Sequence, residues 1–275
     1  MEELAAREAA RVSDEVEAQA MIAMWDAAPA GLRERLGLRV ERVADATLLL
    51  APGLPSPMFN RALCLGMRQP AGMGDVQAIS DVYREAGCKN WWLHWNPQAE
   101  PAGLAQEIEA LGFTLPARRS WAKMLRGGEA PPAIATDLRI APATPPQSGE
   151  VARIAVQSFE MPSFMVEWLQ NLRTGPWRMY AVIDSDAIAG GGCLYLQGKE
   201  AWLGIAAVAP SHRRRGGQGA LMAWRIADAA AGGAVHIVTE TGEPTSAGEA
   251  NPSLANMRRC GFTTVASRLN YAAPA

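Results

Sequence analysis

The feature that most constrains the fold is an order of segments that occurs twice along the chain. In the first half, an apolar segment over 60–67 precedes a helical pattern over 73–88, the strand-like NWWLHW over 90–95 and a helix that ends before Gly112. Gly-Phe-Thr then leads into a strand-like segment that contains Trp121. The order strand, helix, strand, helix, strand predicts an α/β unit whose parallel neighbours are joined by right-handed crossovers.

The second half repeats this order. An apolar segment over 200–209 precedes a helix over 218–232, a strand over 234–240 and a helix that ends before Gly261, again followed by Phe-Thr and a strand with an aromatic residue. Because glycine tolerates a positive φ after the last turn of a helix, Gly112 and Gly261 are predicted helix ends. The repetition predicts two similar units in one chain.

A segment rich in proline and small residues, 127–150, separates the two patterns and predicts domains over 1–130 and 131–275. The hydrophobic content of 49% is enough for a core in each domain. A formal charge of −2 argues against a nucleic-acid partner, and four scattered cysteines suggest no metal site and a reducing, cytoplasmic setting. The chain shows neither a secretory signal nor an apolar run of about 18 residues, so we expect no membrane partner.

A turn rich in arginine and glycine occurs in the second half and has no counterpart in the first. Residues 207–222 read AVAPSHRRRGGQGALM, so that Arg214, Gly217 and Gly219 form the pattern Arg-x-x-Gly-x-Gly between a strand and a helix. Glycines allow a ligand to approach the backbone, and the free N–H groups at a helix start attract an anion. The dinucleotide and P-loop patterns are absent from the turn. The turn therefore predicts a phosphate site of another kind, with solvated basic residues as the alternative.

With its preceding strand and the later Asn251 and Gly261-Phe262, this turn resembles the GNAT superfamily of acetyl-CoA-dependent N-acetyltransferases. The resemblance implies an α/β fold, α+β in some schemes, with two GNAT-like domains in tandem. Each domain would have a mixed, mostly antiparallel central sheet flanked by helices, the first being degenerate. The resemblance also implies that acetyl-CoA is the acyl donor and that it is held by Ala206, Ala207, Val208, Arg213, Arg214, Arg215, Gly216, Gly217, Gln218, Gly219, Ala220, Asn251 and Ser253.

Acyl transfer in this superfamily is the direct attack of an amine on the thioester, which needs a base, an oxyanion donor and an acid. Glu240 closes a predicted strand at the carboxyl edge of the sheet and is the predicted base, with a solvated loop carboxylate as the alternative. The backbone N–H near Val208 would serve the oxyanion. The superfamily often has a tyrosine acid where this chain has Met257, which cannot donate a proton. A CoA-binding or scaffold protein without catalysis is therefore the alternative function.

Two further segments have two interpretations each. Residues 158–172 would cover the acceptor side, and we expect Phe159, Glu160, Phe164 and Trp168 to contact the amine substrate, with core packing as the alternative. The first 30 or so residues form an Ala-rich helix. Three interpretations of this helix are open: it closes a lid over the site, it forms a contact in a homodimer, or it packs against its own chain.

Overall fold

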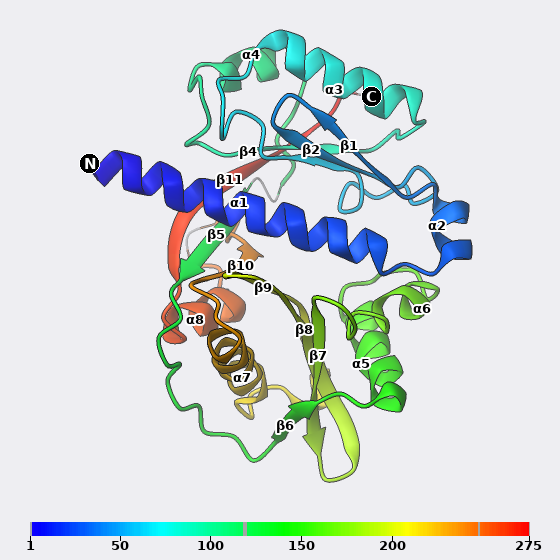
Figure 1. Ribbon diagram of the computed structural model, residues 1–275, viewed down its shortest axis with the longest axis vertical. Helices are drawn as coiled ribbons and strands as arrows, with labels where there is room; N and C mark the ends of the chain where they lie inside the picture. The colour runs from blue at the N-terminus through cyan, green and yellow to red at the C-terminus, as the bar shows by residue number, and fades with distance from the viewer. Residues whose placement is uncertain (1, 118–119, 247, 275) are drawn as a thin grey trace.

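The computed structural model describes residues 2–117, 120–246 and 248–274 (Figure 1). The strands are β1 (Arg39–Val43), β2 (Ala46–Leu50), β3 (Arg61–Leu63), β4 (Trp92–Trp95), β5 (Ser120–Arg126), β6 (Arg139–Pro142), β7 (Trp177–Asp184), β8 (Ala187–Gln197), β9 (Glu200–Val208), β10 (His236–Gly242) and β11 (Thr263–Ala272). The helices are α1 (Glu2–Asp26), α2 (Ala30–Leu36), α3 (Met73–Glu85), α4 (Leu104–Ala110), α5 (Pro145–Ser158), α6 (Met165–Leu169), α7 (Gly217–Ala231) and α8 (Pro252–Arg259).

The repeated order of segments predicted from the sequence is confirmed. The first half forms β3, α3, β4, α4 and β5, and the second forms β9, α7, β10, α8 and β11. Gly112 and Gly261 have φ values of 88° and 84°, as expected after a helix. The strand predicted over 60–67 is shorter, because Cys64 and Gly66 take positive φ values and turn the chain away after Leu63.

Over the described residues the strands form one mixed sheet in the order β1-β2-β3-β4-β11-β5-β10-β9-β8-β7-β6. The pairs β3–β4 and β9–β10 are parallel, and the other neighbouring pairs are antiparallel. Near the middle, the last strands of the two halves are exchanged: β11 pairs with β4, and β5 pairs with β10. Each half therefore receives a strand from the other, while the predicted boundary between residues 130 and 131 stays a prediction.

Helices cover both faces of the sheet. One core joins α1, α5 and α6 to residues such as Trp202 and Val238, whereas α3 and α4 in one half, and α7 and α8 in the other, pack on the opposite face. Helix α1 crosses the molecule between the two halves (Figure 1). The indole N–H of Trp25 donates to the Leu50 carbonyl oxygen at 3.1 Å, so α1 packs against its own chain. No described helix combines the length and apolar character required to cross a membrane.

Candidate active site

The central strands β9 and β10 separate near their middle. They pair only from His236 opposite Glu200 to Val238 opposite Trp202. The hydroxyl of Thr239 then donates to the Leu203 carbonyl oxygen at 2.9 Å, after which β10 continues along β5. The predicted donor-binding residues Ala206, Ala207 and Val208 lie on the part of β9 that has left β10. Backbone groups on that edge are available to a ligand that lies between the strands.

A bulge accompanies this separation, and a buried arginine supports it. The register of β8 and β9 shifts between Gly191 and Cys193, and Ile205 takes a φ of 48°. The guanidinium of Arg225, on α7, donates to the carbonyl oxygens of Cys193 at 2.9 Å and Gly204 at 3.3 Å. Burial lowers the pKa of Arg225 to about 10.

Arg225 was not among the site residues predicted from the sequence. The spacing of Arg225 from Leu221 could have indicated its burial. The two residues are one helical turn apart, and both lie on the buried face of α7. A charge at such a position needs hydrogen-bond acceptors inside the protein.

The glycine-rich turn has the geometry of an anion site. Arg214 and Gly216 have φ values of 65° and 78°, and Gly216 is the N-cap of α7. The first helical hydrogen bond joins the Ala220 N–H to the Gly216 carbonyl oxygen at 3.0 Å. The N–H groups of Gly217, Gln218 and Gly219 therefore precede the hydrogen-bonded ladder and carry the positive end of the helix dipole.

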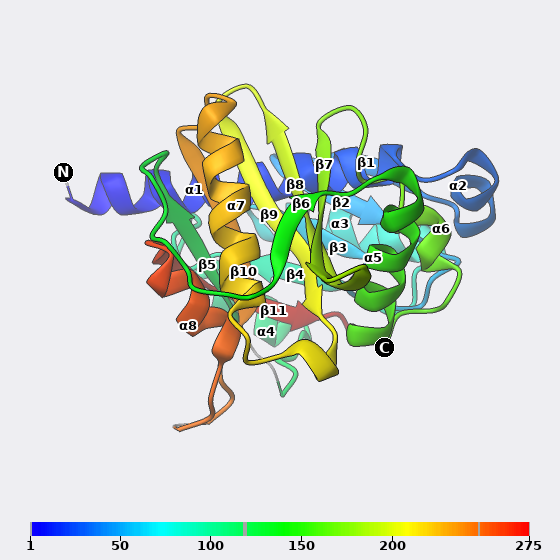
Figure 2. The ribbon, with the colours of Figure 1, turned by 90° about the horizontal axis from the view of Figure 1, so that it is seen from below.

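The same glycines also allow another part of the chain to pack closely against the turn. Residues 134–138, here called the strap, cross the first turn of α7 on the way to β6 (Figure 2). A Cβ atom at residue 216 would overlap the Ala135 carbonyl oxygen, and one at residue 217 would lie 2.8 Å from Cδ1 of Leu138. The hydroxyl of Thr136 donates to the Arg215 carbonyl oxygen at 2.7 Å. The close approach of the strap to the turn therefore requires glycine at 216 and 217, whichever ligand the turn binds.

The three arginines of the turn differ in their surroundings. Arg215 forms ion pairs with Asp137 of the strap and with Asp184, the latter at 2.6 Å. These contacts hold the pKa of both carboxyl groups below the ordinary value. Arg213 and Arg214 are exposed, and Nε of Arg213 donates to the Val208 carbonyl oxygen at 3.3 Å. The charge left for an anionic ligand is therefore that of Arg213 and Arg214.

Polar side chains connect this turn to α8. Nε2 of Gln218 donates to the Ser253 hydroxyl at 3.4 Å. Asn251 is the N-cap of α8: its Oδ1 accepts from the Leu254 N–H at 2.9 Å, and its Nδ2 donates to the Gly242 carbonyl oxygen at 2.6 Å. These contacts hold the start of α8 beside β10 and α7. Contacts of Ala220, Asn251 and Ser253 with acetyl-CoA stay predictions.

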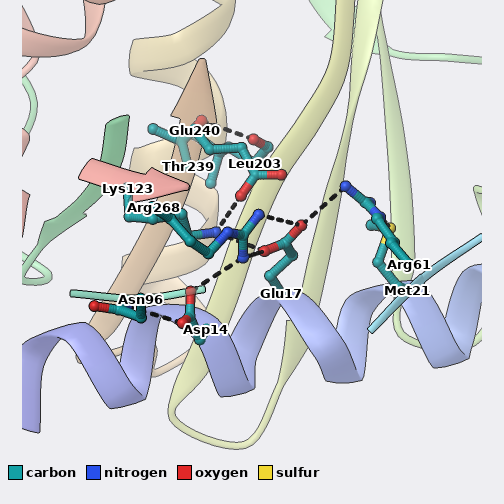
Figure 3. Close-up of polar contacts among 10 residues, drawn as sticks. All are labelled: Asp14, Glu17, Met21, Arg61, Asn96, Lys123, Leu203, Thr239, Glu240 and Arg268. Carbon is teal, nitrogen blue, oxygen red and sulfur yellow. Dashed lines mark hydrogen bonds and ion pairs between the residues drawn. The ribbon is translucent and has the colours of Figure 1, made fainter. Parts of the chain in front are cut away.

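The predicted base lies in a buried group of charges between α1 and the sheet (Figure 3). We call this group the ion cluster, and its members are Asp14, Glu17, Arg61, Lys123, Glu240 and Arg268. Nζ of Lys123 lies 2.7 Å from Glu17 and also contacts Glu240. Arg268 contacts Glu17 and lies 3.0 Å from Asp14. Three carboxylates and three cations make the ion cluster electrically neutral.

The neighbouring charges give the two buried glutamates of the ion cluster different acidities. Burial, and then the charge of Glu17, raise the pKa of Glu240 against the opposing effect of Lys123. Burial also opposes ionisation of Glu17, but Arg268, Lys123 and Arg61 hold its pKa well below the ordinary value. The side chain of Glu240 is 9% exposed, so the alternative of a solvated loop carboxylate is wrong.

The other members of the ion cluster were not predicted as partners of Glu240. Lys123 and Arg268 stand among apolar residues on interior strands, which was the signal for buried charge. Their proximity depends on the exchange of β5 and β11, which the sequence pattern does not reveal.

The predicted acceptor residues are not all on the surface. Phe159 and Glu160 are exposed, whereas Phe164 packs beneath the Arg35 guanidinium, 4.9 Å from its ring centroid. Trp168 is fully buried, its ring packs against Trp25, and its indole N–H donates to the Met24 carbonyl oxygen at 2.7 Å. The predicted substrate contact of Trp168 is therefore corrected, because this side chain joins α6 to α1 within the core.

Met257, at the position of the superfamily tyrosine, is also buried. It belongs to the core beneath α7 and α8. This position therefore offers no side chain that could protonate a leaving thiolate.

No family model matches the chain, and no curated protein matches its sequence. A GCN5-related N-acetyltransferase from Kribbella flavida superposes with a TM-score of 0.66 at 16% identity, over 96% of each chain. One from Sphaerobacter thermophilus gives a TM-score of 0.61 at 17% identity, over 88% of this chain and 84% of that one.

A tandem GNAT protein from the clavulanic acid biosynthesis pathway gives a TM-score of 0.60 at 16% identity, over 84% of this chain and 79% of that one. These likenesses extend over both halves of the chain and confirm the architecture expected from the repeated pattern and the turn. The chain has the tandem GNAT fold.

Proposed function

We propose that the chain is an N-acyltransferase that transfers the acetyl group of acetyl-CoA to an amine of a small molecule or peptide within a ternary complex. The observation that carries the proposal is the position of the glycine-rich turn beside the separated part of β9. The free edge of β9 suits the amides of the pantetheine arm. The first N–H groups of α7, with Arg213 and Arg214, suit the pyrophosphate.

The side chains of the site support a simple division of roles. The thioester supplies an activated acyl carbon, and the backbone N–H near Val208 stabilises the negative charge that develops on its oxygen. Glu240 accepts the proton that the attacking amine loses as the C–N bond forms and the C–S bond breaks. A carboxylate with a raised pKa is the stronger base, which suits Glu240 to this role. Because Met257 offers no proton, the thiolate takes one from water.

The proposal is tested first by acetyl-CoA binding. The thermal midpoint is measured with and without acetyl-CoA for the wild type, Arg214→Glu and the control Lys199→Glu. Lys199 is exposed in the turn that precedes β9, at the opposite end of that strand, and its substitution changes the charge equally. Acetyl-CoA at 100 times its dissociation constant adds about 2.7 kcal/mol, which raises the midpoint by several degrees.

We expect Arg214→Glu to weaken binding at least about tenfold, because it loses a charged contact to phosphate, while Lys199→Glu binds normally. A Gly217→Glu variant would not test donor binding alone, because the new side chain would also displace Leu138. No midpoint shift in the folded wild type contradicts the donor site. A shift without amine-dependent release of CoA, across a panel of primary amines, points instead to a CoA-binding protein without catalysis.

A further inference from the structure

The two carboxyl oxygens of Glu240 are in different surroundings. Oε2 contacts Nζ of Lys123, directly opposite on the antiparallel neighbour β5. Oε1 has no hydrogen-bond partner within residues 2–117, 120–246 and 248–274, and the side chain as a whole is 9% exposed. A carboxylate held at one oxygen and unpaired at the other has a defined direction in which it can accept a proton.

Lys123 is in turn fixed by a residue far away in the sequence. Its side chain is fully buried, and its ammonium group bridges Glu240 and Glu17 of α1. Glu17 is also fully buried and is oriented by contacts with Arg268 and Arg61. Both Lys123 and Glu17 come from the first 130 residues, whereas Glu240 belongs to the half that carries the donor turn (Figure 3).

We propose that Lys123 is a positioning residue for Glu240, held in place by Glu17, so that the N-terminal half completes the acetyl-transfer site. The proposal rests on the proposed function and deepens it. It gives the first half a role in the chemistry although that half lacks a donor turn. It also explains why a lysine is buried on an interior strand, where an unpaired charge would be costly.

The charges around Glu240 determine what loss of Lys123 would do. Lys123 contacts Glu240 from β5, and the charges of Arg268 on β11, Arg61 on β3 and Glu17 on α1 also act on it. Asp14, also on α1, pairs with Arg268. Without Lys123, Glu240 keeps the burial and the repulsion of Glu17 but loses the cation that contacts it. A protonated Glu240 cannot accept a proton from the amine, and its carboxyl group is no longer anchored.

The test is a carboxyl titration in the full chain. Protein labelled with ¹³C at the glutamate side chains is titrated by NMR, and the Glu240 resonance is assigned by its loss in Glu240→Gln. Removing an opposite charge within about 4–6 Å typically changes a carboxyl pKa by 1–3 units, so Lys123→Met should raise that of Glu240 by at least about one unit. Arg61→Met is the matched control: it removes a buried cation that contacts Glu17 but not Glu240, and should shift the titration less.

A second variant gives the opposite sign. Glu17→Gln removes the repelling carboxylate and leaves Lys123 to Glu240 alone, so the pKa of Glu240 should fall. This variant also decides the question if Lys123→Met lacks a cooperative unfolding transition. Unchanged titrations, or equal shifts in Lys123→Met and Arg61→Met, would overturn the proposal.

The titration needs neither acetyl-CoA nor an acceptor. Failure of the proposed function, seen as the absence of a thermal shift with acetyl-CoA, is therefore distinct from failure of this inference. With an amine that reacts, the acidic limb of kcat/KM should move to higher pH in Lys123→Met and return in Lys123→Arg. A limb that stays in place while the NMR pKa rises would contradict the positioning role.

Discussion

Single buried residues determine how this fold responds to pH, and His94 is the clearest case. The side chain is 1% exposed, lies between Trp92 and Trp121, and has no hydrogen-bond partner for either ring nitrogen within the described residues. Burial, and then the charges of Arg268 and Arg61, lower its pKa well below the ordinary value. The unfolded chain binds a proton at His94 below about pH 6.5 and the folded protein does not, so acidification favours unfolding.

His94→Gln should therefore make the protein less sensitive to acid. Between pH 6.5 and 5.5 the wild type should lose about 1 kcal/mol more free energy of unfolding than the variant. Urea denaturation at several pH values measures this difference, and the other titrating groups are the same in both proteins. If the free energy of unfolding changed with pH in the same way in wild type and variant, His94 would bind its proton equally well in the folded and unfolded states.

Among secondary-structure elements, the bulged part of β9 depends on α7 through Arg225. Arg225→Met would keep most of the side-chain volume but leave the carbonyl oxygens of Cys193 and Gly204 without their donor. Because an unsatisfied buried group costs about 1–3 kcal/mol, the free energy of unfolding should fall by at least that amount. Arg153→Met, at an exposed position of α5, is the control, and an equal loss in both variants would contradict the role of Arg225.

The elements themselves were largely predictable, and their exchange was not. Helical periodicity and glycine signals located α3, α7 and α8. Alternation says which face a side chain occupies but not which strand lies beside it. The residue patterns of 120–126 and 263–272 are equally compatible with pairing to β4 or to β10. The proximity of Lys123 and Glu240 therefore could not be predicted from the sequence. Trp168 was misassigned because an apolar stripe looks the same on a substrate wall and in a core.

At the scale of the whole molecule, the exchange joins the two halves more tightly than a linker does. Strand β5 pairs with β10 from Arg126 to Trp121 and with β11 from Leu125 to Ser120, so one strand of the first half lies inside the sheet of the second. Helix α1 adds the buried ion cluster across the same junction. Separating the halves would expose the edges of interior strands and leave buried charges without partners.

Cutting the linker should therefore leave the halves associated. A protease site placed over the mostly exposed residues 130–133 would divide the chain without touching a strand or the strap. We expect the cut protein to elute at the volume of the intact chain in size-exclusion chromatography, while a denaturing gel shows two fragments. Elution in urea, where strand pairing is lost, provides the control for complete cleavage. If the fragments separated in native buffer, each half would hold its own sheet in solution, and a site shared between Lys123 and Glu240 could not persist.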